Sequence, residues 1–152
     1  MRALRQGDRV RLVAPSSALA GAEKLQAGIS CLQAWGLEVE QSFALDRRWG
    51  YLAGEDKARL ADFAGQASLW ACARGGWGSA RLLEQDWQPL GGWLLGFSDV
   101  TSLLWAQVAA GRPGAIHGPL VTTLAAEPAW SQERLRQLLF GEALAPLEGQ
   151  GW

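Results

Sequence analysis

The sequence predicts a doubly wound α/β domain, in which helices cover both faces of a mostly parallel sheet. Strand-length apolar runs alternate with stretches of helical period along the chain. Two of these runs, 67–73 and 93–96, are apolar almost throughout, as in strands that are covered on both faces. The chain has 152 residues, of which 49% are hydrophobic, and this is enough for a domain with its own core. We therefore expect a single domain over 1–152.

The N-terminal third of the chain is predicted to form a strand, a helix and a strand. Residues 9–14 alternate in polarity and end at Pro15-Ser16-Ser17, which indicates a strand followed by a loop. Apolar side chains recur at helical spacing over 22–35, and Gly36 is typical of the position after a helix. Residues 37–41 are expected to form a short second strand.

The middle of the chain continues this alternation. A glycine-containing loop leads into a helix over 55–63, whose first residues are acidic and suit the positive end of the helix dipole. The buried run 67–73 is the third strand, and it continues into the glycine-rich segment 74–78. Ser79 is expected to cap the next helix.

The C-terminal part is predicted to hold two further strands and two helices. Residues 93–96 are predicted to form the fourth strand and 115–119 a last short strand and turn, with a helix over 100–110 between them. Ser131 is expected to cap a final helix that ends at Gly141. The apolar faces expected of these two helices are Val100, Leu103, Leu104 and Val108, and Leu135, Leu138 and Leu139.

Composition points to a cytoplasmic protein without an electrostatic partner. The formal net charge is −1 and charges of both signs are interspersed, which argues against nucleic acid or anionic lipid as a partner. No apolar run is long enough to cross a bilayer, and residues 1–8 do not resemble a signal peptide. Cys31 and Cys72 stand alone in apolar patterns, so we expect buried free thiols, with a disulfide or a catalytic pair as the alternative. One histidine and two separated cysteines suit no metal site, and no cofactor is expected.

Three turn-rich segments are expected to meet at one edge of the sheet. In parallel sheets, sites form at the carboxyl ends of the strands, near the point where the strand order reverses. The segments that follow predicted strands there are 15–17, 74–79 and 97–99. The sequence therefore places a candidate site among these loops.

Ser98 lies where a strand turns sharply into a helix. A serine in this position resembles a nucleophile elbow, in which the turn exposes the hydroxyl and the helix N-terminus points backbone N–H groups at a developing oxyanion. Gly96 fits that pattern, but Val100 does not match the usual G-x-S-x-G form. The alternative is that Ser98 or Asp99 caps the helix that follows.

The loop Arg74-Gly75-Gly76-Trp77-Gly78 favours the first interpretation. Its glycines suit a place where backbone approaches a ligand, and their spacing matches neither a dinucleotide fingerprint nor a phosphate loop. A second N–H donor for an oxyanion is the functional interpretation, and a plain turn is the alternative. Arg74 could bind a substrate carboxylate or a neighbouring acid. His117, the single histidine, could be a base, but its place on a short strand suits a structural residue equally.

Four segments resemble, in order, the signatures of the LD-carboxypeptidase family of serine peptidases, which includes muramoyltetrapeptide carboxypeptidase and the microcin C immunity peptidase. The segments are Gly50-Tyr51-Leu52-Ala53-Gly54, 73–83 (Ala-Arg-Gly-Gly-Trp-Gly-Ser-Ala-Arg-Leu-Leu), 95–101 (Leu-Gly-Phe-Ser-Asp-Val-Thr) and Ile116-His117-Gly118-Pro119. Gly7-Asp8 and 14–17 fit as well, so the resemblance is collinear over nearly the whole chain. Trp77 and Phe97 stand where tyrosine is common in the family, and Leu120 stands where methionine is common.

The resemblance implies a flavodoxin-like or class I glutamine amidotransferase-like fold, and a peptidase that removes a terminal D-amino acid from murein-derived peptides in the cytoplasm. It places the nucleophile on Ser98 and the oxyanion donors on the backbone N–H of Asp99 and on Gly75-Gly76, with Gly76 favoured. Arg74, Ser16 and Trp77 are the candidates for substrate binding.

The resemblance implies that the general base histidine and its orienting glutamate come from a C-terminal domain, which is not expected within residues 1–152. Neither His117 nor Glu127 is assigned in their place. The chain alone is therefore expected to be inactive or nearly so, and to self-associate through Trp130, Trp152 and the run 120–124. The alternatives are a non-catalytic α/β module that binds a peptide or a partner chain, and a small-molecule binding domain, which is disfavoured because only Arg74 accompanies the glycine loop.

Overall fold

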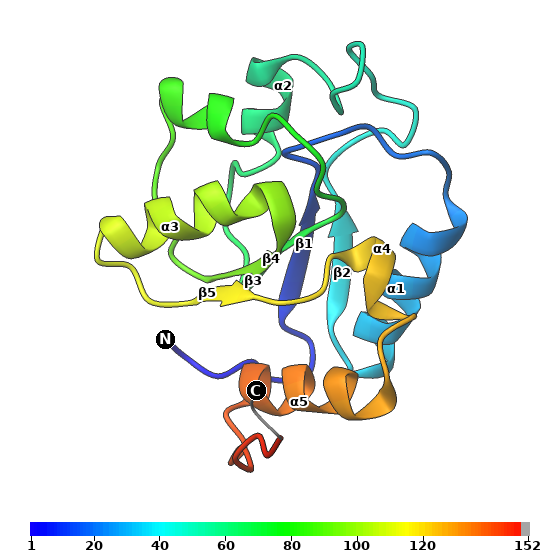
Figure 1. Cartoon of the computed structure of the whole chain (residues 1–152), viewed down its shortest axis with the longest axis vertical. Coiled ribbons are helices and arrows are strands. Elements are labelled where there is room, and N and C mark those ends of the chain that lie inside the picture. The colour runs from blue at the N-terminus through cyan, green and yellow to red at the C-terminus, as the bar shows by residue number, and fades with distance from the viewer. Residues whose placement is uncertain (150–152) are drawn as a thin grey trace.

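Five parallel strands form one sheet in the computed structural model, which describes residues 1–149. The sheet order is β2-β1-β3-β4-β5, with every neighbouring pair parallel (Figure 1). This is the strand order of flavodoxin-like doubly wound folds. The predicted fold class is confirmed. The strands are β1 (Arg9–Val13), β2 (Glu38–Gln41), β3 (Leu69–Cys72), β4 (Trp93–Gly96) and β5 (Ala115–His117).

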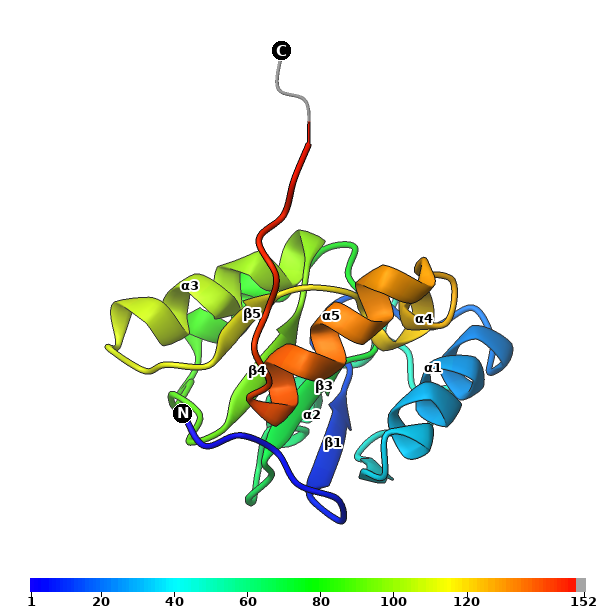
Figure 2. The same cartoon turned by 90° about the horizontal axis from the view of Figure 1, so that it is seen from below.

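Helices cover both faces of the sheet (Figures 1 and 2). One buried cluster joins the sheet to α1, α4 and α5, and a second joins it to α3 and to the segments around α2. Two 3₁₀ turns, Ala80–Glu84 and Ser98–Val100, complete the elements. The helices are α1 (Glu23–Ala34), α2 (Asp56–Ala61), α3 (Thr101–Ala109), α4 (Val121–Leu124) and α5 (Ala129–Phe140).

The first helix packs closely on α4. Leu25, Gly28 and Leu32 of α1 are buried at helical spacing, as the apolar pattern of 22–35 predicts. Gly28 is required there, since a Cβ at this position would clash with the backbone carbonyl of Val121. The predicted end of α1 is also confirmed, because Gly36 has a φ of +82° directly after the C-cap residue Trp35.

Three local predictions are wrong. Ser79 begins a 3₁₀ turn without capping it, and Ser131 lies inside α5, where its hydroxyl donates to Glu127 Oε2 (3.0 Å). Val108 is 52% exposed, whereas the polar Gln107 is buried. Gln107 is satisfied by the backbone of Leu90, accepting its N–H at 2.6 Å and donating to its carbonyl at 3.3 Å, which makes a buried amide tolerable.

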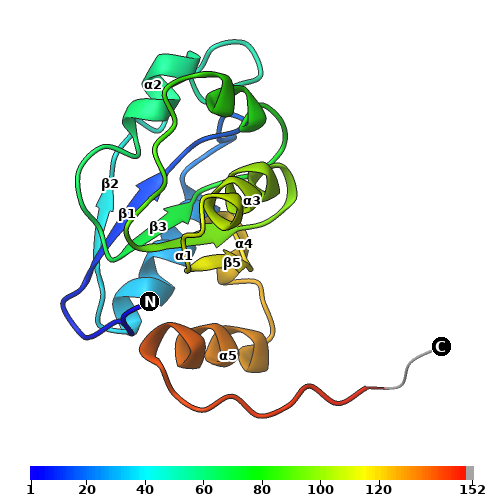
Figure 3. The same cartoon turned by 90° about the vertical axis from the view of Figure 1, so that its left-hand side faces the viewer.

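The run 120–124 is not a surface patch. Val121 and Leu124 are buried because the short helix α4 packs them against α1 and the sheet, and Leu120 is buried in the cluster that contains α3 (Figure 3). A helix of four residues is too short to show a period in sequence. Trp130 is exposed as predicted, and Trp152 lies outside the described residues. Among residues 1–149, no helix is long and apolar enough to cross a membrane.

Candidate active site

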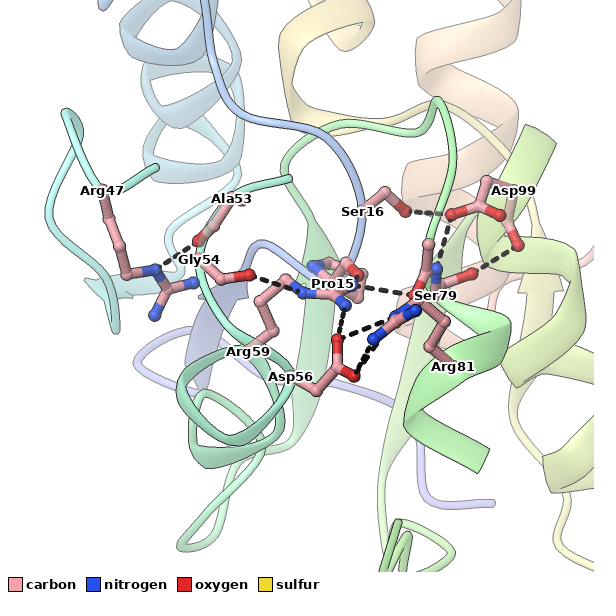
Figure 4. A network of polar contacts seen from close by, with 11 residues as sticks. Pro15, Ser16, Arg47, Ala53, Gly54, Asp56, Arg59, Ser79, Arg81 and Asp99 are labelled. Atoms are coloured by element: carbon pink, nitrogen blue, oxygen red, sulfur yellow. Dashed lines mark hydrogen bonds and ion pairs between the residues drawn. The ribbon is translucent and has the colours of Figure 1, made fainter. Parts of the chain in front are cut away.

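Three loops meet at the carboxyl ends of β1, β3 and β4. Strand β1 lies between β2 and β3. After β1 the chain adds β2 on one side of it, and then places β3 on the opposite side. This reversal is the topological switch point at which doubly wound folds place their sites. The loops that follow these strands, 14–20, 73–79 and 97–99, carry the residues of the predicted site, and the structure brings them together (Figure 4).

Ser98 has the backbone strain of a nucleophile elbow. Its φ is +62°, and no other non-glycine residue among 1–149 has a positive φ. An L-residue in this region costs about 1–2 kcal/mol, and such strain clusters at functional sites. The Ser98 side chain is exposed at the turn between β4 and α3.

Helix capping does not explain this serine. No side-chain cap hydrogen bond is made at the start of the 3₁₀ turn or of α3. The Asp99 carboxylate accepts hydrogen bonds from Ser16 and Ser79 instead. The cap interpretation of Ser98 and Asp99 is therefore wrong.

Glycines let the backbone approach Ser98 closely. A Cβ at Gly75 would lie 3.0 Å from Ser98 Cβ and 3.2 Å from its Oγ, and a Cβ at Gly96 would lie 2.9 Å from Val100 Cγ1. Gly76 has a φ of +117°, and a Cβ there would clash with Ser17 and lie 2.8 Å from the Tyr51 hydroxyl oxygen. The glycine loop is thus packed against the elbow rather than being a free turn.

Asp99 fastens the three loops together. Its Oδ2 accepts hydrogen bonds from Ser16 Oγ at 2.7 Å and from the Ser79 N–H at 2.8 Å, and its own carbonyl accepts from Ser79 Oγ at 2.6 Å (Figure 4). The Ser17 side chain and N–H both donate to the Gly75 carbonyl. Ser16, a candidate for substrate binding, is fully buried and holds the turn by donating to Asp99.

A pocket of about 570 Å³ opens beside Ser98. Arg74 contributes to its wall and donates from Nη1 to the Ala18 carbonyl at 2.7 Å. Trp77, another candidate for substrate binding, is 59% exposed and lies outside this lining. The lining comprises 19–21, Glu23, Lys24, 74–76, Phe97, Ser98, Leu120, Thr122 and Thr123.

His117 and the cysteines take no part in a described catalytic arrangement. His117 is exposed at the end of β5 rather than buried, and its ring lies edge-on to Phe97, with the centroids 6.2 Å apart. Within residues 1–149 it makes no hydrogen bond to Ser98. Both cysteines are free, and complete burial raises the pKa of the Cys72 thiol, so this thiol stays protonated.

The comparison that decides the family is with the sequence model of the LD-carboxypeptidase N-terminal domain, which matches residues 10–118. The chain belongs to the LD-carboxypeptidase family. A putative carboxypeptidase of Synechocystis is 46% identical over 158 aligned positions, covering 98% of this chain and 52% of that protein. The murein tetrapeptide carboxypeptidase of Pseudomonas aeruginosa is 37% identical over 145, covering 86% and 46%. The chain thus spans about half the length of the curated relatives that it matches.

Solved structures show the same fold in longer proteins. A protein of Bacillus anthracis that resembles the microcin immunity protein MccF superposes with a TM-score of 0.76 at 20% identity, over 90% of this chain and 46% of the other. A muramoyltetrapeptide carboxypeptidase of Oxalobacter formigenes superposes with a TM-score of 0.68 at 20% identity, over 86% and 47%. At these identities the likeness concerns the fold.

One residue that organises this LD-carboxypeptidase domain was missed in the sequence. Arg59 of α2 is completely buried and connects three loops, donating to the carbonyls of Gly54 (3.0 Å), Gly78 (2.9 Å) and Pro15, and pairing with Asp56 (Figure 4). In sequence, an acid and an arginine three positions apart on a polar helix indicate a solvated ion pair. Burial of the guanidinium depends on loops that only the tertiary structure brings around it.

Asp56 is shared between two arginines. Its Oδ2 lies 2.7 Å from Arg81 Nη2, and its Oδ1 pairs with Arg59. The hydrogen bond from Arg81 is the largest influence that lowers the pKa of the Asp56 carboxyl, and Arg59 acts in the same direction. The stabilisation is therefore present above the unfolded-state pKa of this aspartate and is lost as pH falls through the lowered value.

Proposed function

We propose that this chain is the nucleophile-bearing half of a cytoplasmic serine-type LD-carboxypeptidase, which hydrolyses the L,D-peptide bond holding a terminal D-amino acid in murein peptides. The observation that carries the proposal is the φ of +62° at the exposed Ser98, between β4 and α3, with Gly75 packed against it. The names of two relatives support the substrate class: the murein tetrapeptide carboxypeptidase of P. aeruginosa, and a probable murein peptide carboxypeptidase of Bacillus subtilis, which is 34% identical.

In the proposed reaction, Ser98 Oγ adds to the scissile carbonyl while a base removes its proton. The backbone N–H groups of Asp99 and Gly76 would then donate to the oxyanion of the tetrahedral intermediate, with Gly75 providing room for the approach. Within residues 1–149 neither N–H donates to another protein group, so both are available. Collapse of the intermediate releases the D-amino acid, and water hydrolyses the acyl-enzyme.

We further propose that the base belongs to the other half of the enzyme, and that residues 1–152 alone are inactive or nearly so. The test is reconstitution: this chain is mixed with, or fused to, the C-terminal half of the Synechocystis relative, and D-alanine release from an L,D-tetrapeptide is measured. Release is expected only when both halves are present. Rapid release by the chain alone would contradict the proposed division of the site.

Gly75→Ala is expected to lower the rate of the reconstituted enzyme by about 10²-fold, because the added methyl group would contact Ser98 Cβ at 3.0 Å and displace the nucleophile. Gly91→Ala is the matched control, since a Cβ there meets nothing within 4 Å and Gly91 has no positive φ. The measurement is kcat/KM for both variants. Equal rates in the two would show that the close approach of Gly75 does not matter for the reaction.

A non-catalytic module that binds a peptide or a partner is the alternative. A fluorophosphonate probe separates the two, because only an activated serine reacts readily. Labelling of the reconstituted protein that disappears in Ser98→Ala supports the enzyme. Absence of labelling, with peptide binding retained, supports the module.

Self-association of the isolated chain is a further part of this proposal. Burial of Leu120, Val121 and Leu124 removes one of its predicted contacts, and the exposed Trp130 (65%) remains to support it. Light scattering at high concentration measures it, and a strictly monomeric chain would contradict it.

A further inference from the structure

A second pocket opens between α2 and the loop 86–91. It has a volume of about 530 Å³, and it shares no lining residue with the pocket beside Ser98. Its wall is largely apolar: α2 contributes Leu60, the loop contributes Trp87 and Leu90, and β3 contributes Trp70. A cavity of this size and composition is typical of sites for small organic ligands.

This pocket has hydrogen-bond donors that no protein group uses. The indole nitrogens of Trp70 and Trp87 are buried without an acceptor, and no other buried side-chain nitrogen or oxygen among residues 1–149 lacks a partner. A buried indole N–H normally finds an acceptor. Lys57 also lines the pocket and forms no ion pair within the same range. Asp86, the acid of the lining, already accepts a hydrogen bond from Gln88 Nε2 at 2.7 Å.

We propose that this pocket is a second ligand site, which takes a small planar carboxylate and whose occupancy lowers the reactivity of Ser98. A planar apolar body matches the aromatic wall, where the Phe63 and Trp87 rings pack edge-on with their centroids 4.8 Å apart. The carboxylate oxygens match the unpartnered indole N–H groups and the Lys57 ammonium. Because both indole nitrogens are closed to solvent, the ligand reaches them only when the loop 86–91, which carries Trp87, moves outward.

Both sides of this pocket continue into the candidate active site. On one side, Lys57 of α2 lines the pocket, whereas Arg59 of the same helix donates to the loops that follow β1 and β3 (Figure 4). On the other side, the loop 86–91 comes shortly after the 3₁₀ turn that carries Arg81, whose Nη2 lies 2.7 Å from Asp56 Oδ2. The ion pair between Arg81 and Asp56 therefore joins the two sides of the pocket.

Movement of the loop 86–91 acts on two contacts of the site, because the turn before it moves with it. The ion pair of Arg81 with α2 lengthens, and so does the hydrogen bond from the Ser79 N–H, at the start of that turn, to the Asp99 carboxylate (2.8 Å). Asp99 follows Ser98 directly, so the ligand-bound state holds the nucleophile less firmly. The two states differ in affinity for the ligand, and this difference couples the two sites. The effect on Ser98 rests on the proposed function, whereas binding in the pocket does not.

The first experiment titrates the full chain, with ¹⁵N in its indole groups, with indole-3-acetate as the probe. The NMR signals of Trp70 and Trp87, assigned with Trp70→Phe and Trp87→Phe, are expected to shift. The affinity for indole-3-acetamide, which has the same rings without the charge, is expected to be at least about fivefold lower. No shift of these two signals up to the solubility limit, or equal affinities for the two compounds, would overturn the site.

The chain supplies a matched control for this titration, because it contains two lysines. Lys57→Met is expected to weaken binding of indole-3-acetate at least about threefold, since it removes the cation of the pocket. Lys24→Met makes the same substitution in the pocket beside Ser98 and is expected to leave the affinity unchanged. Equal affinities of the two variants would overturn the role of Lys57 and with it the carboxylate site.

The second experiment measures fluorophosphonate labelling of Ser98 in the reconstituted enzyme, with and without saturating indole-3-acetate. The labelling rate is expected to fall at least about threefold with the probe. Equal slowing in Lys57→Met at a concentration that does not saturate the unchanged chain would show that the probe acts elsewhere. That result would overturn the coupling, as would an unchanged rate while the indole signals shift.

Failure of the proposed function is distinguishable from failure of this inference. If Ser98 does not label even without the probe, the proposed nucleophile fails, while the indole signals still decide whether the second site exists. The backbone amide signal of Ser79 in the isolated chain then decides the coupling. It is expected to shift when indole-3-acetate binds, and an unmoved signal would show that the pocket does not act on the loops of the site.

Discussion

Ser98→Ala is expected to lower D-alanine release by the reconstituted enzyme at least about 10⁴-fold. Removal of the hydroxyl removes the group that would form the acyl-enzyme, and the oxyanion donors and substrate binding are left to supply the residual rate. The measurement is kcat for Ser98→Ala against the unchanged chain, each combined with the same C-terminal half. A loss of less than about tenfold would show that Ser98 is not the nucleophile.

The same position allows a separate test of its backbone strain. Ser98→Gly should lose activity as Ser98→Ala does, but it should be more stable than Ser98→Ala by about 1 kcal/mol, because glycine adopts a φ of +62° without a Cβ penalty. Urea unfolding of the isolated chain measures this difference. Equal stabilities of the two variants would contradict the strained turn.

Arg59→Met is expected to cost the domain about 3–5 kcal/mol of its free energy of unfolding. The substitution leaves the carbonyls of Pro15, Gly54 and Gly78 without their donor in a buried place, and it removes one of the two partners of Asp56. A domain of this size has only about 5–15 kcal/mol in total, so the variant would be close to unfolding at room temperature. Urea denaturation, followed by circular dichroism, measures the change.

The control for this prediction is Arg136→Met. It makes the same substitution at an arginine whose ion pairs, with Glu133 and Glu142, lie on the surface. It should leave the unfolding midpoint almost unchanged, because exposed ion pairs contribute little. Arg59→Lys should remain strongly destabilised, since an ammonium cannot reproduce a planar group that reaches three carbonyls and a carboxylate. A stable Arg59→Lys variant would show that charge alone, rather than the guanidinium geometry, holds the loops.

The predictable parts of this protein are those that local residues determine. The apolar runs of β3 and β4, the helical period of α1 and the glycine after it each depend on a few neighbouring residues, and each is confirmed. Two of the failed predictions depend on distant partners. The Gln107 amide can be buried because the Leu90 backbone satisfies it, and Val121 and Leu124 are covered because Gly28 lets α1 approach α4.

The candidate site likewise has a part that the sequence predicts and a part that only the tertiary structure shows. The order of the motifs in the sequence was enough to indicate the family and to place Ser98, Asp99 and the glycine loop at one edge of the sheet. The residues that hold this edge could not be predicted, because a hydrogen bond between positions that lie far apart in sequence has no local pattern. Only the tertiary structure shows that the Asp99 carboxylate accepts a hydrogen bond from the Ser16 hydroxyl and that Arg59 is enclosed by three loops.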